Sequence, residues 1–138
     1  MKTETIMNLL LKMARDVEPV GQARLAAAIV YKNDIVAFGT NKKKTHPFQR
    51  RFCKHENAIN LHAETDAIKN ALRDLSVDQL SRSSLYVARV RYETSQIDLN
   101  KKFLRPGLAK PCVGCSRAIS TFGIQKVCYS CDEGYDWL

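Results

Sequence analysis

The segment His62-Ala63-Glu64-Thr65-Asp66-Ala67-Ile68 places an imidazole and a carboxylate at the start of an apolar helical pattern. The apolar residues that follow recur on one face, which predicts a helix over 61–72 whose last turn is closed by Arg73. Further along the chain, the segment Pro111-Cys112-Val113-Gly114-Cys115 opens a second helical pattern. These two helix starts carry the candidate metal-binding and catalytic side chains.

One imidazole and two thiols form a set of three zinc ligands. His62, Cys112 and Cys115 supply them, one fewer than a closed structural site contains, so a position remains for water. Pro111 suits the first position of its helix and Gly123 suits the C-terminal cap. Because Cys112 and Cys115 are three residues apart at a helix start, both sulfurs can face one way and the helix dipole favours their thiolates. The pattern indicates a catalytic zinc site.

Glu64 is the candidate catalytic residue beside this site. It follows His62 by two residues, so on a helix the two side chains point in different directions, and we do not expect Glu64 to be a fourth ligand. Its carboxylate can instead take a proton from the water and pass protons to a substrate nitrogen.

Outward from the two helix starts, strands and helices alternate. An N-terminal helix is predicted over 4–17, with Thr3 as its N-cap. The predicted strands cover 25–31, 35–38, 85–90 and 124–129, the first two joined by the turn Lys32-Asn33-Asp34. The segments 40–60 and 93–110 are predicted to be irregular loops. This order predicts a layered α/β domain with a partly parallel sheet.

Three motifs resemble those of the cytidine and deoxycytidylate deaminase superfamily, and the resemblance spans most of the chain. HAETDAI at 62–68 resembles H-A-E-x-N/A-A-I, PCVGCSRAI at 111–119 resembles the P-C-x-x-C helix, and GTN at 39–41 resembles the G-x-N that ends the second strand. GLAK at 107–110 and KTHP at 44–47 are similar to small deaminases of phage type. The resemblance implies a cytidine-deaminase-like three-layer α/β/α sandwich with a mixed central sheet, and a zinc-dependent hydrolytic deaminase.

The same resemblance implies a role for each matching residue. It assigns the metal to His62, Cys112 and Cys115, proton transfer to Glu64, a hydrogen bond to the sugar to Asn41, and a contact with the pyrimidine carbonyl to the Ala63 backbone N–H. A histidine as first ligand is more similar to the deoxycytidylate, cytosine and tRNA-adenosine branches than to free-nucleoside cytidine deaminases, which usually have cysteine there.

The sequence departs from the superfamily pattern in three places. Asp66 stands where many deoxycytidylate enzymes have asparagine. The eighteen residues of 93–110 separate the third strand from Pro111, where the superfamily commonly has only a few. Nine residues follow Tyr129, so we expect the fifth strand and the C-terminal helix of many relatives to be short or absent.

The segment 42–54 concentrates positive charge. It contains six basic and no acidic residues, in a chain with a formal net charge of +8. A solvated loop is one interpretation; the other is a phosphate-contacting loop in which Lys43, Lys44, Arg50 and Arg51 bind the substrate. A phosphate-contacting loop favours a cytosine nucleotide as the substrate, dCMP above all. The enzyme would convert it to the uracil product with release of ammonia. The alternative enzymatic function is deamination of a polynucleotide base, either adenosine in tRNA or cytosine in single-stranded DNA.

The cysteines also allow two other metal sites. Cys112-x-x-Cys115 and Cys128-x-x-Cys131 could form a closed zinc ribbon in a nucleic-acid-binding module without enzymatic activity. A ribbon needs both pairs on short turns, whereas 116–122 is helical and 126–129 is strand-like, so we expect Cys128 to be a small buried hydrophobe and Cys131 a loop thiol. Cys53, His46 and His55 could hold a second zinc, but no fourth ligand is visible and a surface loop is favoured.

Length and composition set the outer limits of the interpretation. At 138 residues, with 45% hydrophobic and 26% charged residues, the chain is expected to form one domain, 1–138. It contains no apolar run of membrane-spanning length and no signal-peptide pattern, and five cysteines are an odd number, so we expect a cytoplasmic protein without disulfides. The expected ligands are Zn2+ and a small cytosine nucleotide or nucleoside, and self-association into a homo-oligomer is expected.

Overall fold

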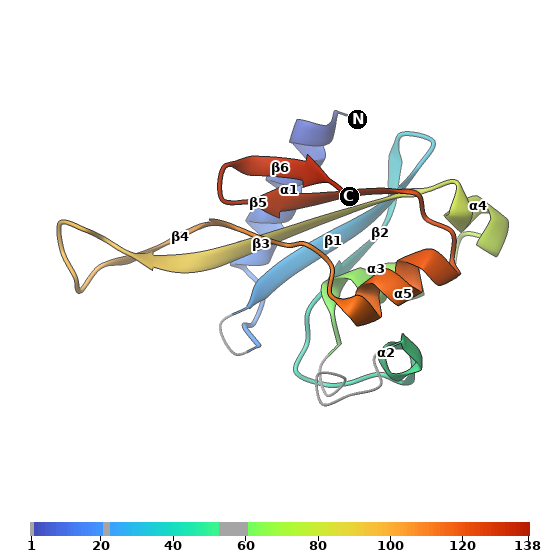
Figure 1. The fold of residues 1–138 in the computed structure, drawn as a ribbon, viewed down its shortest axis with the longest axis horizontal. Helices are drawn as coiled ribbons and strands as arrows, with labels where there is room; N and C mark the ends of the chain where they lie inside the picture. The colour runs from blue at the N-terminus through green and yellow to red at the C-terminus, as the bar shows by residue number, and fades with distance from the viewer. Residues whose placement is uncertain (1, 21–22, 53–60) are drawn as a thin grey trace.

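The computed structural model describes residues 2–20, 23–52 and 61–138, and its centre is a six-stranded mixed sheet (Figure 1). The strand order is β2-β1-β3-β5-β6, and β4 pairs with the outer half of β3. The strands are β1 Arg24–Tyr31, β2 Asp34–Thr40, β3 Ser84–Thr94, β4 Lys102–Gly107, β5 Lys126–Cys131 and β6 Gly134–Trp137. Among the strands of the described residues, β3 and β5 pair in parallel and the other pairs are antiparallel. The predicted mixed sheet is confirmed.

Helices cover both faces of this sheet. α1, Thr3–Arg15, packs on one face, where Ile6 and Leu10 are fully buried. α3, Ala63–Ala71, and α5, Val113–Thr121, lie on the other face, in the larger apolar core. Figure 1 shows the sheet between these layers, which confirms the three-layer arrangement. No helix in the described part of the chain has the length and apolar character needed to cross a membrane.

The N-terminal helix and the first hairpin follow the prediction closely. α1 begins at Thr3, so Thr3 is the first helical residue; the cap position belongs to Lys2, whose side chain makes no capping hydrogen bond, and the predicted Thr3 cap is wrong. Lys32 and Asn33 have φ values of +51° and +67° between β1 and β2. Positive φ at both central positions is the geometry of the two-residue turn that suits the strand twist.

The segment 93–110 is irregular only in part, which corrects the prediction for residues 93–94 and 102–107. β3 continues to Thr94, and β4 returns antiparallel beside it, with Arg91 paired to Arg105 and Arg89 paired to Gly107. Pairing between the two strands stabilises them, and the local sequence has no alternating apolar pattern that would predict a strand. In Figure 1 this hairpin extends beyond the body of the molecule.

Two short helices are further corrections. α2, Pro47–Phe52, interrupts the predicted loop 40–60, because Phe48 and Phe52 are buried one turn apart and pack on Phe122 of the α5 end. α4, Val77–Ser81, is closed by a capping box between Ser76 and Gln79.

The C-terminal part begins with a helix whose start differs by two residues from the prediction. Cys112 is the N-cap of α5, so Pro111 precedes the helix instead of opening it. Phe122 is the C-cap of α5, so Gly123, predicted at the cap, follows it by one residue; its φ of +71° is the left-handed conformation that ends many helices. β6 is the short final strand and pairs with β5.

Gly39 sets how closely α3 approaches β2. A Cβ atom at Gly39 would overlap the backbone of α3 at Ala63 and Ala67. The start of α3 therefore lies directly against the end of β2, and this contact positions the residues of the site.

Candidate active site

His62, Cys112 and Cys115 come together where the starts of α3 and α5 meet. His62 Nδ1 lies 3.2 Å from Cys115 Sγ and 3.5 Å from Cys112 Sγ, and the potential ligand atoms of the three residues all lie within 4.8 Å of one another. His62 occupies the N-cap position of α3, and Cys112 occupies that of α5. The two helix starts therefore deliver the three side chains that the sequence predicts as ligands.

The chemistry and spacing of this set fit zinc. Zn–S bonds of about 2.3 Å and Zn–N bonds of about 2.0 Å place two tetrahedral ligands about 3.5 Å apart. The distances from His62 to the two cysteine sulfurs are close to this value. Within the described residues, no other group of three or more His, Cys, Asp or Glu side chains converges in this way. Three ligands leave one position open, as in catalytic zinc sites.

The two thiols interact strongly with each other. The pKa of Cys112 falls to about 3, chiefly because the Cys115 thiol hydrogen-bonds to the Cys112 sulfur, with a further contribution from His62. The same hydrogen bond, together with burial, raises the pKa of Cys115. Both shifts follow from the closeness of the two sulfurs, and metal binding requires both thiols to lose their protons.

Glu64 lies one residue inside α3 and is almost completely buried. Burial raises its pKa; the backbone hydrogen bond and the charge of His62 oppose this shift, and the charge of Cys112 reinforces it. A buried carboxyl group with a raised pKa can both accept and donate protons.

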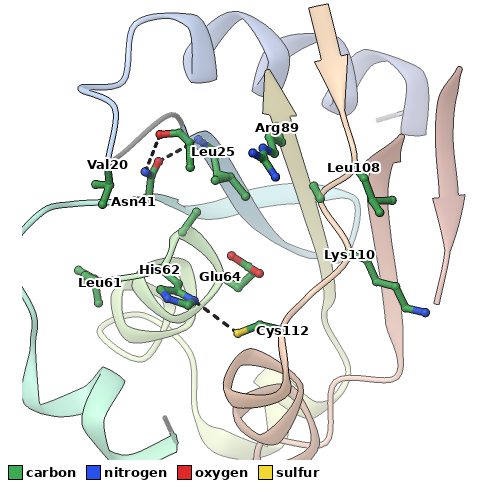
Figure 2. A pocket seen from close by; sticks show the side chains of 13 residues that line it. Val20, Leu25, Asn41, Leu61, His62, Glu64, Arg89, Leu108, Lys110 and Cys112 are labelled. Atoms are coloured by element: carbon green, nitrogen blue, oxygen red, sulfur yellow. Dashed lines mark hydrogen bonds between the residues drawn. The ribbon is translucent and has the colours of Figure 1, made fainter. Parts of the chain in front are cut away.

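A cavity of about 260 Å3 opens beside the ligand set (Figure 2). Asn41, Ala63 and Glu64 line it together with His62 and Cys112. Asn41 is buried; its Oδ1 accepts from the Leu25 N–H at 2.8 Å and its Nδ2 donates to the Ala23 carbonyl at 3.0 Å. Ala63 is the first residue of α3, so its N–H has no acceptor inside the helix and is available to a ligand.

Arg89 and Lys110 also line this cavity, and the sequence analysis did not identify either of them. In the view of Figure 2, Arg89 lies at the opposite end of the cavity from Cys112. The sequence signal for Arg89 is a cation inside the apolar run Leu85–Val90, a position where a charged side chain needs a reason. Lys110 carries no such signal, because its position depends on the path of the chain after β4.

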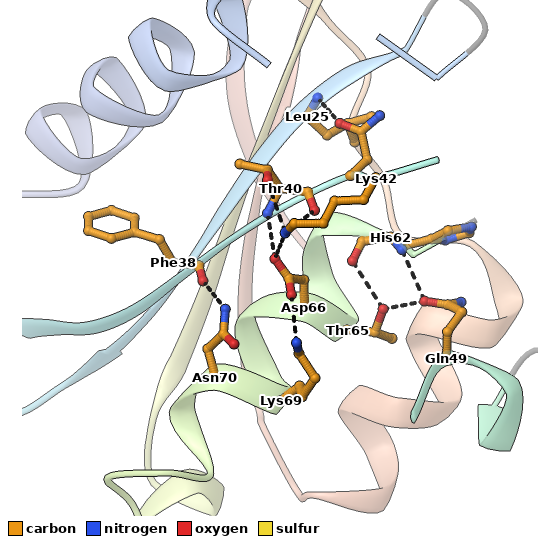
Figure 3. A network of polar contacts seen from close by, with 11 residues as sticks. Leu25, Phe38, Thr40, Lys42, Gln49, His62, Thr65, Asp66, Lys69 and Asn70 are labelled. Atoms are coloured by element: carbon orange, nitrogen blue, oxygen red, sulfur yellow. Dashed lines mark hydrogen bonds and ion pairs between the residues drawn. The ribbon is translucent and has the colours of Figure 1, made fainter. Parts of the chain in front are cut away.

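Gln49 is a supporting residue that was also missed. It is fully buried, and its Oε1 accepts hydrogen bonds from the His62 backbone N–H and the Thr65 hydroxyl. Thr65 in turn donates to the His62 carbonyl (Figure 3). These contacts tie α2 to the start of α3 and hold the backbone of the metal-ligand residue.

Asp66 explains one departure from the superfamily pattern. Its buried carboxylate accepts from the Thr40 N–H at 3.1 Å and pairs with Lys42 at 2.6 Å and Lys69 at 3.3 Å (Figure 3). Asp66 therefore fixes α3 to the end of β2, and Lys42 acts as its partner.

The structure does not bring the four predicted phosphate-contacting cations to the cavity. Lys43 pairs with the exposed Glu18 at 3.0 Å, and Arg50 and Arg51 line a separate pocket with Thr45 and Pro47. Lys44 is exposed, and its carbonyl accepts from the Leu61 N–H. Contact between these side chains and a substrate phosphate stays a prediction.

The described residues do not assemble either of the alternative metal sites. Cys128 is fully buried in the core beneath α1, as predicted, and it takes no part in the ligand cluster. Cys131 ends β5, so it is a strand residue instead of the predicted loop thiol, and the structure does not join the four cysteines in one site. Of the proposed second set, Cys53 and His55 lie outside the described residues, and His46 accepts the Phe48 N–H at 3.1 Å.

Comparison with known proteins agrees with this geometry. The sequence matches the family of the cytidine and deoxycytidylate deaminase zinc-binding region over residues 1–131. The apo crystal structure of dCMP deaminase from the cyanophage S-TIM5 is 23% identical, with a TM-score of 0.57 over 94% of this chain and 84% of that one. The structure of that enzyme with dCMP and dUMP is 22% identical, with a TM-score of 0.53 over 94% and 82%. No curated protein matches the sequence.

The family match covers nearly the whole chain, and the His62, Cys112 and Cys115 cluster fits the metal of that family. The chain belongs to the cytidine and deoxycytidylate deaminases and is a zinc-dependent hydrolytic deaminase.

Proposed function

We propose that the enzyme hydrolyses the amino group of a cytosine nucleotide, with dCMP as the preferred substrate. The observation that carries the proposal is the cavity, whose lining includes Glu64 and two zinc-binding residues as well as the cations Arg89 and Lys110. Such a lining suits a ligand with a reactive base at one end and an anionic group at the other. The similar cyanophage enzyme, crystallised with dCMP and dUMP, supports a nucleotide of this kind.

The start of α3 would hold the base. The Ala63 N–H, unpaired within the helix, donates to the pyrimidine carbonyl, and this contact fixes the face of the ring presented to Glu64. Asn41 is held by the backbone at Ala23 and Leu25, and the second hydrogen of its Nδ2 is directed to the sugar. Both contacts orient the substrate without moving the backbone.

Glu64 would carry the protons. Zinc held by His62, Cys112 and Cys115 supplies a nucleophile at neutral pH by lowering the pKa of water. Glu64 accepts the proton released from water and delivers it to the ring nitrogen next to C4. The water oxygen bonds to C4, and Glu64 then takes the proton of the new C4 hydroxyl and gives it to the amino group. The carbon–nitrogen bond breaks, ammonia leaves and a carbonyl remains at C4. The product is the uracil nucleotide.

A substrate panel tests the proposal. The zinc-loaded protein is assayed for ammonia release from dCMP, CMP, deoxycytidine, cytidine and a cytosine-containing oligonucleotide. We expect the highest kcat/KM with dCMP. Efficient deamination of the oligonucleotide with dCMP untouched would contradict the proposed substrate.

A further inference from the structure

Arg89 lies at the junction of the active-site cavity and a second, larger groove. The same side chain lines the 260 Å3 cavity beside Glu64 and a neighbouring groove of about 560 Å3. Arg24, Arg91 and Lys102 also line the groove, and among the described residues that line it none is acidic. A ligand that leaves the cavity past Arg89 would therefore enter a positively charged space.

The guanidinium of Arg89 lacks an acceptor of its own. Its Nε is buried and makes no hydrogen bond within the described part of the chain. No carboxylate among the described residues forms an ion pair with it. A buried donor without an acceptor is costly, and a guanidinium matches the oxygens of a phosphate well. An anionic ligand would relieve this cost.

Acidic side chains neutralise little of the positive charge around Arg89. Arg24 donates to the carbonyls of Arg15 and Val17 and lies 5.4 Å from the centre of the Tyr92 ring, so no acid neutralises it within the described residues. Arg91 is 3.5 Å from the half-exposed Asp132, which is a weak pair. The potential in the groove is therefore positive around Arg89.

The β3–β4 hairpin places Arg89 in this position. Ser130 of β5 fixes the point where the hairpin departs: its hydroxyl accepts from the Arg89 N–H at 2.9 Å and donates to the Gly107 carbonyl at 2.7 Å. A Cβ atom at Gly107 would lie 3.3 Å from Arg91 Cδ and 3.6 Å from Arg89 Cγ, so glycine leaves room for both side chains. The hairpin includes most of the segment 93–110, by which this chain departs from the superfamily pattern.

We propose that Arg89, presented by the β3–β4 hairpin, binds the substrate phosphate and selects nucleotides over nucleosides. The inference rests on the proposed function and adds to it a specificity-determining residue. The phosphate oxygens receive the guanidinium hydrogens at the mouth of the cavity, while Arg24, Arg91 and Lys102 raise the local positive potential.

The test compares Arg89→Gln and Arg89→Lys with the wild type, all loaded with zinc. We expect Arg89→Gln to lower the ratio of kcat/KM for dCMP to kcat/KM for deoxycytidine by about 10- to 100-fold, mainly through the KM for dCMP. Arg89→Lys keeps the charge and should restore part of this ratio, which a purely structural role would not predict. Arg82, the exposed C-cap residue of α4, pairs with Asp78; Arg82→Gln is the matched control and should leave the ratio unchanged.

Calorimetry with the product separates this inference from the proposed function. We expect dUMP to bind more tightly than deoxyuridine, and Arg89→Gln to remove the difference. If no cytosine compound is deaminated but dUMP still binds through Arg89, the proposed function fails and the phosphate site stands. The inference is overturned if Arg89→Gln leaves the ratio intact while Arg50→Gln lowers it. It is also overturned if the variant impairs use of an oligonucleotide and dCMP is not a substrate.

Discussion

In the proposed reaction, the buried side chain of Glu64 links the fold to the chemistry. It needs a helix start to bring it beside the zinc ligands and an apolar surrounding to raise its pKa. Neither requirement involves binding the metal. Its removal should therefore separate metal binding from turnover.

We expect Glu64→Gln to bind zinc as the wild type does and to lose about 1,000-fold in kcat, because the amide cannot accept the proton from water. Metal analysis and a dCMP assay on the same preparation measure both properties. Turnover near the wild-type level with full zinc content would exclude Glu64 as the proton carrier.

We expect substitutions in the two cysteine pairs to have opposite effects on zinc content. Cys112→Ser should lose zinc, because a site with three protein ligands cannot lose one thiolate without a large loss of affinity. Cys128→Ser is the control, and it should keep zinc since Cys128 lies in the core beneath α1. Equal loss of metal from both variants, measured by mass spectrometry under native conditions, would favour the ribbon instead.

Cys128 also predicts a pH dependence of stability. Burial raises the pKa of its thiol to about 11, with smaller contributions from Asp136 and Cys131. The folded state keeps a proton that the unfolded state loses near pH 8.5, so this contribution is complete below that pH and is lost as the pH rises toward 11. Urea unfolding at pH 8 and pH 10.5 should show a larger loss of stability for the wild type than for Cys128→Ala. Parallel losses would contradict this account.

At the scale of elements, the contact of α3 with β2 determines where the ligands lie. Gly39 allows the close approach, and Asp66 fixes it through the Thr40 N–H and Lys42. The helix start that carries His62 and Glu64 is thus held from the strand side. Gln49 of α2 holds it from the opposite side.

Asp66→Ala should lower the free energy of unfolding by about 3 kcal/mol, because it leaves a buried N–H and two lysines without their acceptor. Asp66→Asn retains an acceptor for the Thr40 N–H and should cost about 1 kcal/mol. Denaturant titrations of the zinc-loaded variants measure both. Equal costs for the two substitutions would show that the carboxylate charge does not matter.

The elements differ in how well the sequence predicts them, and the reasons are physical. α1, α3 and the β1–β2 hairpin carry local periodicity and turn residues, so their existence follows from short segments. β4 depends on pairing with β3, and α2 depends on an aromatic contact with Phe122, which lies seventy residues away in the chain. Non-local contacts of this kind leave little local pattern.

At the scale of the whole molecule, the cluster of His62, Cys112 and Cys115 and the position of Glu64 beside it were predictable because two short motifs contain them. The cations that line the cavity were not. Composition indicated the basic run 42–54 as the phosphate-contacting segment. The cavity is instead lined by Arg89, whose position follows from the register of β3 between β1 and β4. Charge counts identify cations, but only tertiary structure shows which of them face a ligand. Self-association stays a prediction.

The most direct test of the proposed hydrolysis follows the oxygen when zinc-loaded enzyme and dCMP are incubated in water labelled with 18O. We expect one ammonia per turnover and a dUMP product that carries a single 18O atom at C4, seen by mass spectrometry, with both products formed about 1,000-fold more slowly by Glu64→Gln. Unlabelled product, or dCMP left intact by enzyme that contains its full complement of zinc, would contradict it.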